Sequence, residues 1–149
     1  MTSDQRGFTL IELMVTLAIL GILAAMALGT FRGFAAKAKQ AEAKVNLGAI
    51  GELAIAYRSE HDTYVTDLAS LGWSPNLVTR YRYWYNGLAA LGTPTNPDAG
   101  VDYSDIGSAA TADSFTAAAV GNVDTDDTND QWTFNEQREL VNLRNDPFL

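Results

Sequence analysis

The stretch G-F-T-L-I-E-L-M-V-T-L-A-I-L-G-I-L-A-A-M-A-L-G-T-F occupies residues 7–31 and decides how the chain is organised. From Phe8 to Phe31 it is a predominantly apolar run in which Glu12 is the only charge. As a helix rising about 1.5 Å per residue, this run is long enough to cross roughly 30 Å of hydrocarbon. An ionised side chain inside a membrane is costly, so we expect Glu12 to have a partner and a function.

The rest of the 149-residue chain is strongly acidic. From Ala41 onward there are 6 basic and 16 acidic residues, a net charge of −10. Because contacts to phosphate groups need Lys and Arg, this composition predicts no direct nucleic-acid site. The chain has no cysteine, which excludes a disulfide framework and thiol catalysis.

The small residue Gly7 precedes the apolar run, whereas a secretory signal peptide has its small-residue cleavage site after a shorter run. The segment from Gly7 to Ala27 resembles the class III signal and N-terminal helix of type IV pilins and of type II secretion pseudopilins. The resemblance implies that residues 1–7 are a leader peptide, which a prepilin peptidase cuts off between Gly7 and Phe8. It also implies N-methylation of the new amine on Phe8.

The resemblance further implies partners and a location. The subunit would wait in the inner membrane as a single-pass protein, and an inner-membrane assembly platform would then add it to a helical homopolymer. The finished filament would lie on the cell surface. The expected partners are thus other copies of the chain, the peptidase, the platform and, before assembly, the membrane.

The positions of these residues fit that chemistry. Gly7 has no side chain, so a protease can approach the backbone closely. Cleavage would leave a cationic amine on Phe8, since an α-amino group has a pKa near 8. Glu12 follows four residues later, about one helical turn away. It could pair with its own amine or, as the resemblance implies, with that of the next subunit, which would set axial register.

Gly21 and Gly29 interrupt the second part of the apolar run. Glycine inside a helix costs about 1 kcal/mol relative to alanine, so both positions need a reason. Many of the proteins that the chain resembles have a proline in place of Gly29. Two interpretations stay open: a segment that is helical in the membrane and melts or extends in a filament, and close helix packing in lipid through small residues.

A helical pattern continues beyond the membrane segment to about Arg58. Buried positions are predicted at a spacing of three and four, with further apolar residues broadening the stripe. The predicted stripe consists of Ala43, Leu47, Ile50, Ala54 and Tyr57, broadened by Val45, Ala49, Leu53 and Ala56. We therefore expect one helix from Phe8, with a transmembrane and filament-core part at 8–31 and an amphipathic second part.

The C-terminal region supplies the surface for this amphipathic helix. Strands are expected at Val78–Asn86, Ser114–Val120, Gln131–Asn135 and Glu139–Leu143. In the first strand Tyr81, Tyr83 and Tyr85 face one side, and Asn86-Gly87 indicates a turn. We expect a short helix at Asp67–Leu71 and an exposed loop at Gly92–Ala112. The predicted fold is α+β, a long N-terminal helix packed on a small antiparallel sheet, with residues 32–149 forming the amphipathic helix and globular head.

Four aspartates lie within residues 124–130 and repel one another unless they bind a cation or fan into solvent. Their spacing is similar to that of calcium loops but is not that of an EF-hand. Asn129 stands at the glycine position, and Asn135 stands where a bidentate glutamate is needed. A bound Ca²⁺ and a solvated acidic turn both remain open. The predicted calcium ligands are Asp124, Asp126 and Asp130.

The function expected from these features is structural. There is no nucleophile–base pair, phosphate loop or His-rich metal site, and His61, the only histidine, is expected on the surface. The resemblance is strongest to deltaproteobacterial type IVa major pilins, which implies twitching motility, adhesion or DNA uptake. The alternative is a type II secretion major pseudopilin forming a short periplasmic filament.

Overall fold

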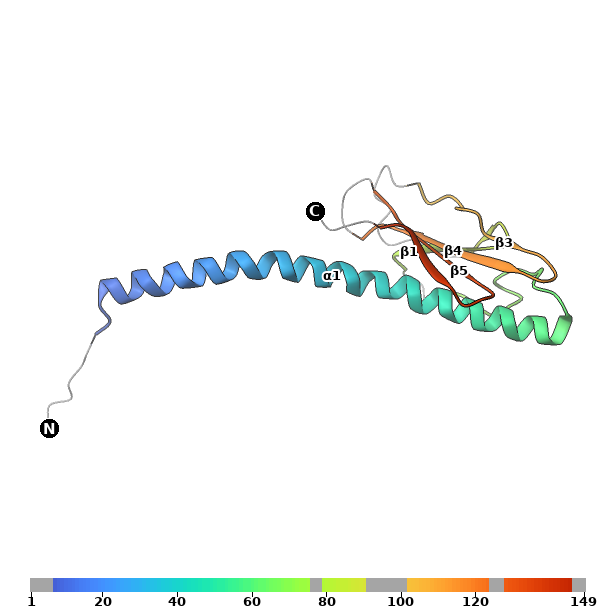
Figure 1. The fold of residues 1–149 in the computed structure, drawn as a ribbon, viewed down its shortest axis with the longest axis horizontal. Coiled ribbons are helices and arrows are strands. Elements are labelled where there is room, and N and C mark those ends of the chain that lie inside the picture. Colours follow the sequence, from blue (N-terminus) through green and yellow to red (C-terminus); the bar gives the residue numbers. More distant parts are fainter. Residues whose placement is uncertain (1–6, 76–78, 91–101, 124–127, 146–149) are drawn as a thin grey trace, which may run out of the picture. The chain divides into compact units, whose positions relative to one another are not determined.

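The computed structural model describes residues 7–75, 79–90, 102–123 and 128–145. It contains one helix, α1 (Leu10–His61), and an antiparallel sheet of six strands (Figure 1). The strands are β1 (Tyr81–Tyr85), β2 (Leu88–Ala89), β3 (Ala109–Ala110), β4 (Phe115–Gly121), β5 (Asp130–Asn135) and β6 (Leu140–Arg144). This architecture confirms the predicted α+β class. The chain divides into two compact units, Met1–Ala35 and Ala36–Leu149, and α1 contributes to both.

The N-terminal unit is helical from Leu10, two residues later than predicted. Thr9 precedes the helix and caps it, which is why the helix does not begin at Phe8. Every residue from 7 to 34 is exposed. In the described part of the chain, α1 is the one helix that is long and apolar enough to cross a membrane.

The second part of α1 buries one face within the C-terminal unit. Ala43, Leu47, Ile50 and Ala54 are fully buried, as the spacing predicts, whereas Tyr57 is half-buried. The predicted broadening of this stripe is wrong at three positions, all of them exposed; Val45, for example, is 70% exposed. Each lies two residues after a buried position, and two residues turn a helix by about 200°. The three exposed positions are Val45, Ala49 and Ala56.

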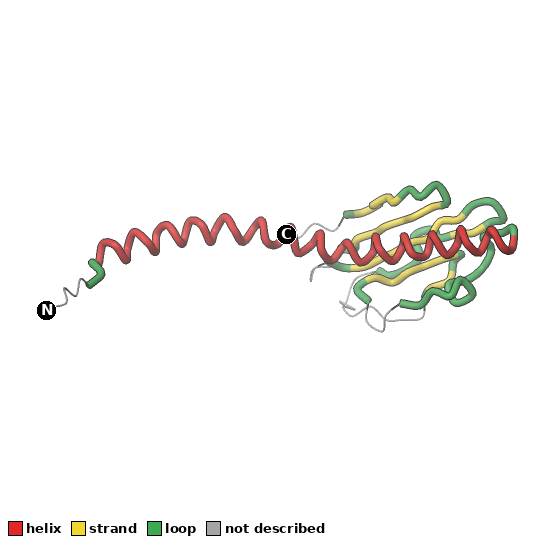
Figure 2. Tube along the Cα trace, turned by 90° about the horizontal axis from the view of Figure 1, so that it is seen from below, coloured by secondary structure: helices red, strands yellow, loops and turns green. Residues whose placement is uncertain are grey.

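The sheet has the strand order β2-β1-β4-β5-β6, and β3 pairs with β4. Figure 2 shows the C-terminal part of α1 running across one face of these strands. Tyr81, Tyr83 and Tyr85 alternate along β1 toward this face and are buried, as predicted. Aromatic and alanine residues of β4 and β5 complete the core: Phe115, Ala117, Ala119, Trp132 and Phe134.

The three tyrosine hydroxyls of β1 each bond a different element. Tyr81 donates to Asp130 Oδ2 at 2.7 Å, and Tyr85 donates to the Tyr64 carbonyl at 2.9 Å. The Tyr83 hydroxyl accepts a hydrogen bond from Asn46 Nδ2 at 2.8 Å. Burial raises the pKa of all three hydroxyls above their usual range, so the neutral phenols belong to the folded core.

Two glycines permit close approaches inside this core. A Cβ on Gly51 of α1 would overlap the ring of Phe134, and one on Gly121 of β4 would overlap the ring of Tyr81. The helix therefore sits directly on β5 at Gly51. Gly48, one turn earlier, has open space where its Cβ would lie.

The local predictions between the strands have mixed outcomes. Asn86 and Gly87 both have positive φ, 51° and 73°, which confirms the tight turn and brings β2 back along β1. The two-residue strand β2 was not predicted, and β3 lies inside the predicted loop at Gly92–Ala112. The segment at Asp67–Leu71 forms turns rather than a helix, because it ends at Gly72 (φ 74°) after a single turn.

Candidate assembly site

Glu12 takes part in a reciprocal cap at the start of α1. Its Oε2 accepts hydrogen bonds from the Thr9 backbone amide at 2.9 Å and from the Thr9 hydroxyl at 2.7 Å. In return, the Glu12 amide donates to Thr9 Oγ1 at 3.3 Å. This is a capping box, in which two residues three apart satisfy the free amides of a helix N-terminus.

Thr9 is the functional residue that the sequence interpretation missed. The sequence contains a signal for this role, since T-L-I-E at residues 9–12 has the capping-box pattern, in which Thr9 and Glu12 bond each other. The cap fixes the carboxylate one turn from Phe8. A carboxylate offers about four lone-pair sites and Thr9 takes two of them, so two remain for a cationic amine.

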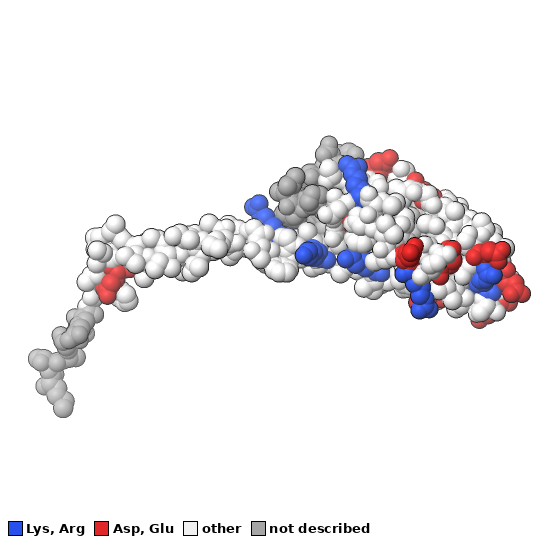
Figure 3. Space-filling view, in the orientation of Figure 1, with Lys and Arg blue, Asp and Glu red and all other residues white. Residues whose placement is uncertain are grey.

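The surface around this carboxylate is apolar. Phe8 is 88% exposed, and large apolar side chains stay exposed along the N-terminal unit as far as Phe34. Figure 3 shows the charged side chains concentrated on the C-terminal unit, and Glu12 is the only charge between residues 8 and 31. A continuous exposed apolar surface of this kind indicates contact with lipid or with other protein chains.

Gly21 and Gly29 both lie inside α1, which is helical across them. A Cβ at either position would meet no atom within 4 Å. Packing within the chain therefore does not require these glycines. Both interpretations of them, a segment that melts in a filament and close packing against neighbouring helices, concern the environment outside the subunit and stay predictions.

The predicted calcium ligands are only partly within the described residues. Asp124 and Asp126 lie outside them, so calcium binding there stays a prediction. Asp130 is fully buried at the start of β5, and its oxygens accept hydrogen bonds from uncharged side chains. Within the described ranges, no three His, Cys, Asp or Glu side chains are grouped so as to hold a metal.

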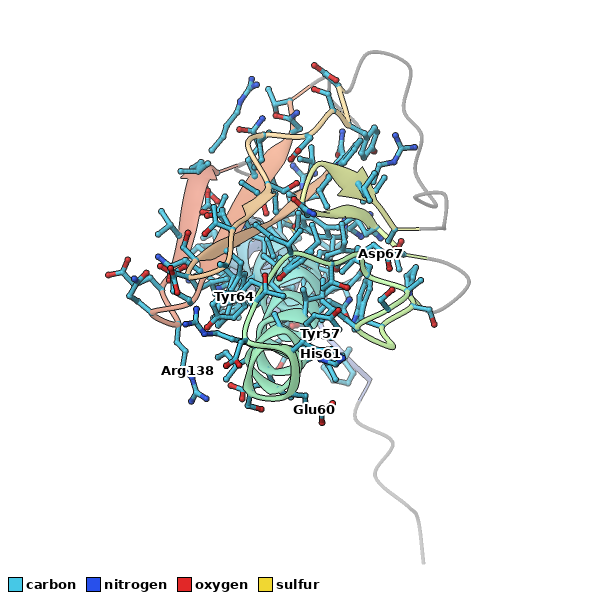
Figure 4. The ribbon with its side chains drawn as sticks, turned by 90° about the vertical axis from the view of Figure 1, so that its right-hand side faces the viewer. Tyr57, Glu60, His61, Tyr64, Asp67 and Arg138 are labelled. Atoms are coloured by element: carbon cyan, nitrogen blue, oxygen red, sulfur yellow. The ribbon has the colours of Figure 1, made fainter. Side chains whose placement is uncertain are left out.

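His61 lies at the exposed C-terminal end of α1. Its ring stacks on Tyr57 with centroids 4.0 Å apart, and Nδ1 lies 3.1 Å from the Tyr57 carbonyl oxygen (Figure 4). Arg82 and Trp84, on the outer face of β1, both contact Tyr103, the first over its ring and the second through its carbonyl. The contacts of His61, Arg82 and Trp84 are thus made to side chains and backbone of the same chain. We therefore take the N-terminal segment as the candidate site.

Comparisons with known proteins point to the same segment. Residues 2–28 match the family described as the prokaryotic N-terminal methylation motif. The chain is 47% identical over 79 residues to the type IV major pilin protein PilA of Myxococcus xanthus, covering 53% of this chain and 36% of that protein. It is 39% identical over 82 residues to the fimbrial protein EcpC of Eikenella corrodens, covering 52% and 50%. It is 35% identical over 83 residues to the type IV major pilin protein PilE of Neisseria gonorrhoeae, covering 56% and 50%.

The match to the N-terminal methylation motif thus includes Gly7, Phe8 and Glu12. Over these segments the chain is similar to type IV major pilins, in agreement with the resemblance seen in its sequence. The matched regions span about a third to half of the length of these relatives. The relatives are structural pilins and not enzymes, in agreement with the expectation from the sequence.

Proposed function

We propose that this chain is the structural subunit of a type IV pilus, a homopolymer that serves motility, adhesion or DNA uptake. The proposal rests on one combination: the methylation motif, a capped Glu12 and an apolar first part of α1 that is exposed as far as residue 34. An apolar surface of this length needs membrane or protein around it. A filament of identical chains supplies the protein environment, and the membrane supplies the environment before assembly.

Processing and assembly act on the same few residues. A prepilin peptidase removes residues 1–7, and the amine of Phe8 is methylated. The subunit waits in the inner membrane until the assembly platform adds it to the filament. There the Phe8 amine of one subunit approaches the Glu12 carboxylate of another, at the two lone-pair sites that Thr9 leaves open. The pair forms in a water-poor environment, where an opposite charge relieves the cost of the carboxylate.

A deletion experiment tests this function. Cells that lack the chain should lose their long surface filaments, and a plasmid that supplies the chain should restore them in electron micrographs. A plasmid supplying the Gly7→Val variant should restore none, because a side chain there blocks the approach of the peptidase. Deleted cells that keep long filaments but lose protein secretion would overturn the proposal in favour of a pseudopilin.

A further inference from the structure

The carboxylate of Asp130 is fully buried at the start of β5 and joins four elements. Its Oδ1 accepts hydrogen bonds from Gln40 Nε2 at 3.2 Å and Asn142 Nδ2 at 3.0 Å. Its Oδ2 accepts hydrogen bonds from the Tyr81 hydroxyl at 2.7 Å and from the indole nitrogen of Trp132. The donors come from α1, β6, β1 and β5, so a single side chain holds the helix and three strands together.

The number of these donors matches the hydrogen-bonding capacity of the carboxylate. A carboxylate offers about four lone-pair sites, and these four donors are uncharged side chains. A calcium ligand must present a lone pair to the ion. Because its oxygens are bound in this way, Asp130 has a structural role. This role is independent of whether Asp124 and Asp126 bind calcium.

The orientation of Asn142 shows how strongly this site favours donors. Its amide nitrogen points at Asp130, while its oxygen is buried without a hydrogen-bond partner among the described residues. Turning the amide would bring the oxygen against the carboxylate and lose the bond. The hydrogen bond to Asp130 therefore decides the orientation even at the cost of an unsatisfied acceptor.

The same cluster reaches the last described residues of the chain. Gln40 Nε2 also donates to Asn145 Oδ1 at 2.8 Å, and Arg144 Nη1 donates to Asn129 Oδ1 at 3.2 Å. The chain has no cysteine with which a disulfide could fasten this end. Ala36 and Gln40 are the first buried residues of α1. The point where the helix first contacts the sheet and the end of β6 are thus tied at one place.

We propose that Asp130 is a buried anionic latch that works without a metal ion and fastens the first buried turn of α1 and the end of β6 to the sheet. We call the cluster of Asp130, Gln40, Tyr81, Trp132 and Asn142 the Asp130 latch. A carboxylate is needed at position 130, because the amide of an asparagine there would point its own N–H groups at the donors of the other latch residues. This inference goes beyond the pilus proposal, since it concerns the folding of the C-terminal unit and does not depend on assembly.

The test uses the full chain in detergent micelles with the variant Asp130→Asn, which keeps the shape of the side chain. Asp113→Asn is the matched control, because Asp113 pairs with Arg58 at 2.9 Å but its side chain is 86% exposed. In Asp130→Asn we expect the melting temperature to fall by roughly 10 °C. Hydrogen exchange in residues 36–43 and 140–145 should become at least about tenfold faster. The control should melt within about 2 °C of the original chain.

A second variant keeps the inference testable if Asp130→Asn does not fold. Gln40→Leu keeps the carboxylate and its donors from β1, β5 and β6, and removes the two hydrogen bonds that the Gln40 amide makes to Asp130 and Asn145. Exchange should then rise in the first buried turn of α1 and near Asn145, while β1 and β4 keep their protection. Unchanged exchange and melting in both variants would overturn the latch. It would also fail if calcium chloride, compared with EDTA, stabilised the original chain but not Asp130→Asn.

Discussion

The two parts of α1 have the same backbone structure and opposite surroundings. Residues 10–34 are exposed on every side, although most are apolar. From Ala36 to Ala54 the same helix buries a narrow stripe on its own sheet and adds polar contacts through Gln40, Asn46 and Glu42. The sheet of the same chain thus covers one face of the second part of α1, whereas the apolar surface of the first part is left uncovered.

The two parts of α1 should therefore respond differently to substitution. The second part is stabilised by contacts that the monomer already contains, so its substitutions should change folding. The first part has no buried side chain up to residue 34, so its substitutions should change assembly or membrane insertion and leave the C-terminal unit intact. The predictions that follow separate these two effects.

The largest expected effect is on assembly, at Glu12. Glu12→Gln keeps an amide that can still cap α1 but removes the charge, and Thr9→Ala removes the cap but keeps the charge. We expect Glu12→Gln to lower the yield of sheared filaments at least about tenfold, with the subunit still in the membrane fraction. Thr9→Ala should keep most filaments. Equal yields from Glu12→Gln and the original chain would show that the charge does not drive assembly.

The next effect is on folding, at two glycines of the second part. Gly51→Ala should destabilise the C-terminal unit by about 1–3 kcal/mol, because the new methyl group overlaps the Phe134 ring. Gly48→Ala is the matched control, since it has open space and should stabilise the helix by about 0.5–1 kcal/mol. Thermal unfolding in detergent, followed by circular dichroism, measures both. Shifts of the same sign would mean that the helix does not sit on β5 as described.

Alkaline unfolding should also be confined to the C-terminal unit. Burial raises the pKa of Tyr81, Tyr83 and Tyr85, so the stability that they contribute is present below the unfolded pKa of about 10 and is lost as pH rises through the folded values. Ultraviolet titration should show these tyrosines ionising only as the unit unfolds. Reversible ionisation of all six tyrosines near pH 10 in the folded chain would contradict the buried packing of β1.

The smallest effect is expected at the exposed ion pair between Arg138 and Glu52. The two side chains lie 3.1 Å apart and are 61% and 59% exposed. Arg138→Ala should change the free energy of unfolding by no more than about 0.5 kcal/mol, because exposed pairs are screened by solvent. Chemical denaturation measures this change. A loss above about 1 kcal/mol would mean that the β5–β6 turn helps to hold α1.

The fold was largely predictable because its main signals are local. The spacing of Ala43, Leu47, Ile50 and Ala54 and the alternation of tyrosines along β1 each reflect one side of one element. The two-residue strands β2 and β3 were not predictable, because pairing with β1 and β4 defines them rather than their own composition. For Asp130 the sequence shows a carboxylate in an acidic stretch, and only the long-range contacts of Gln40 and Tyr81 place it in the core.

Whether the N-terminal part of α1 is an assembly element can be measured by intact-mass spectrometry of sheared, purified surface filaments. The main component should be this chain beginning at Phe8 and carrying one methyl group. Filaments that lack the chain, or that contain it beginning at Met1, would contradict this assembly role.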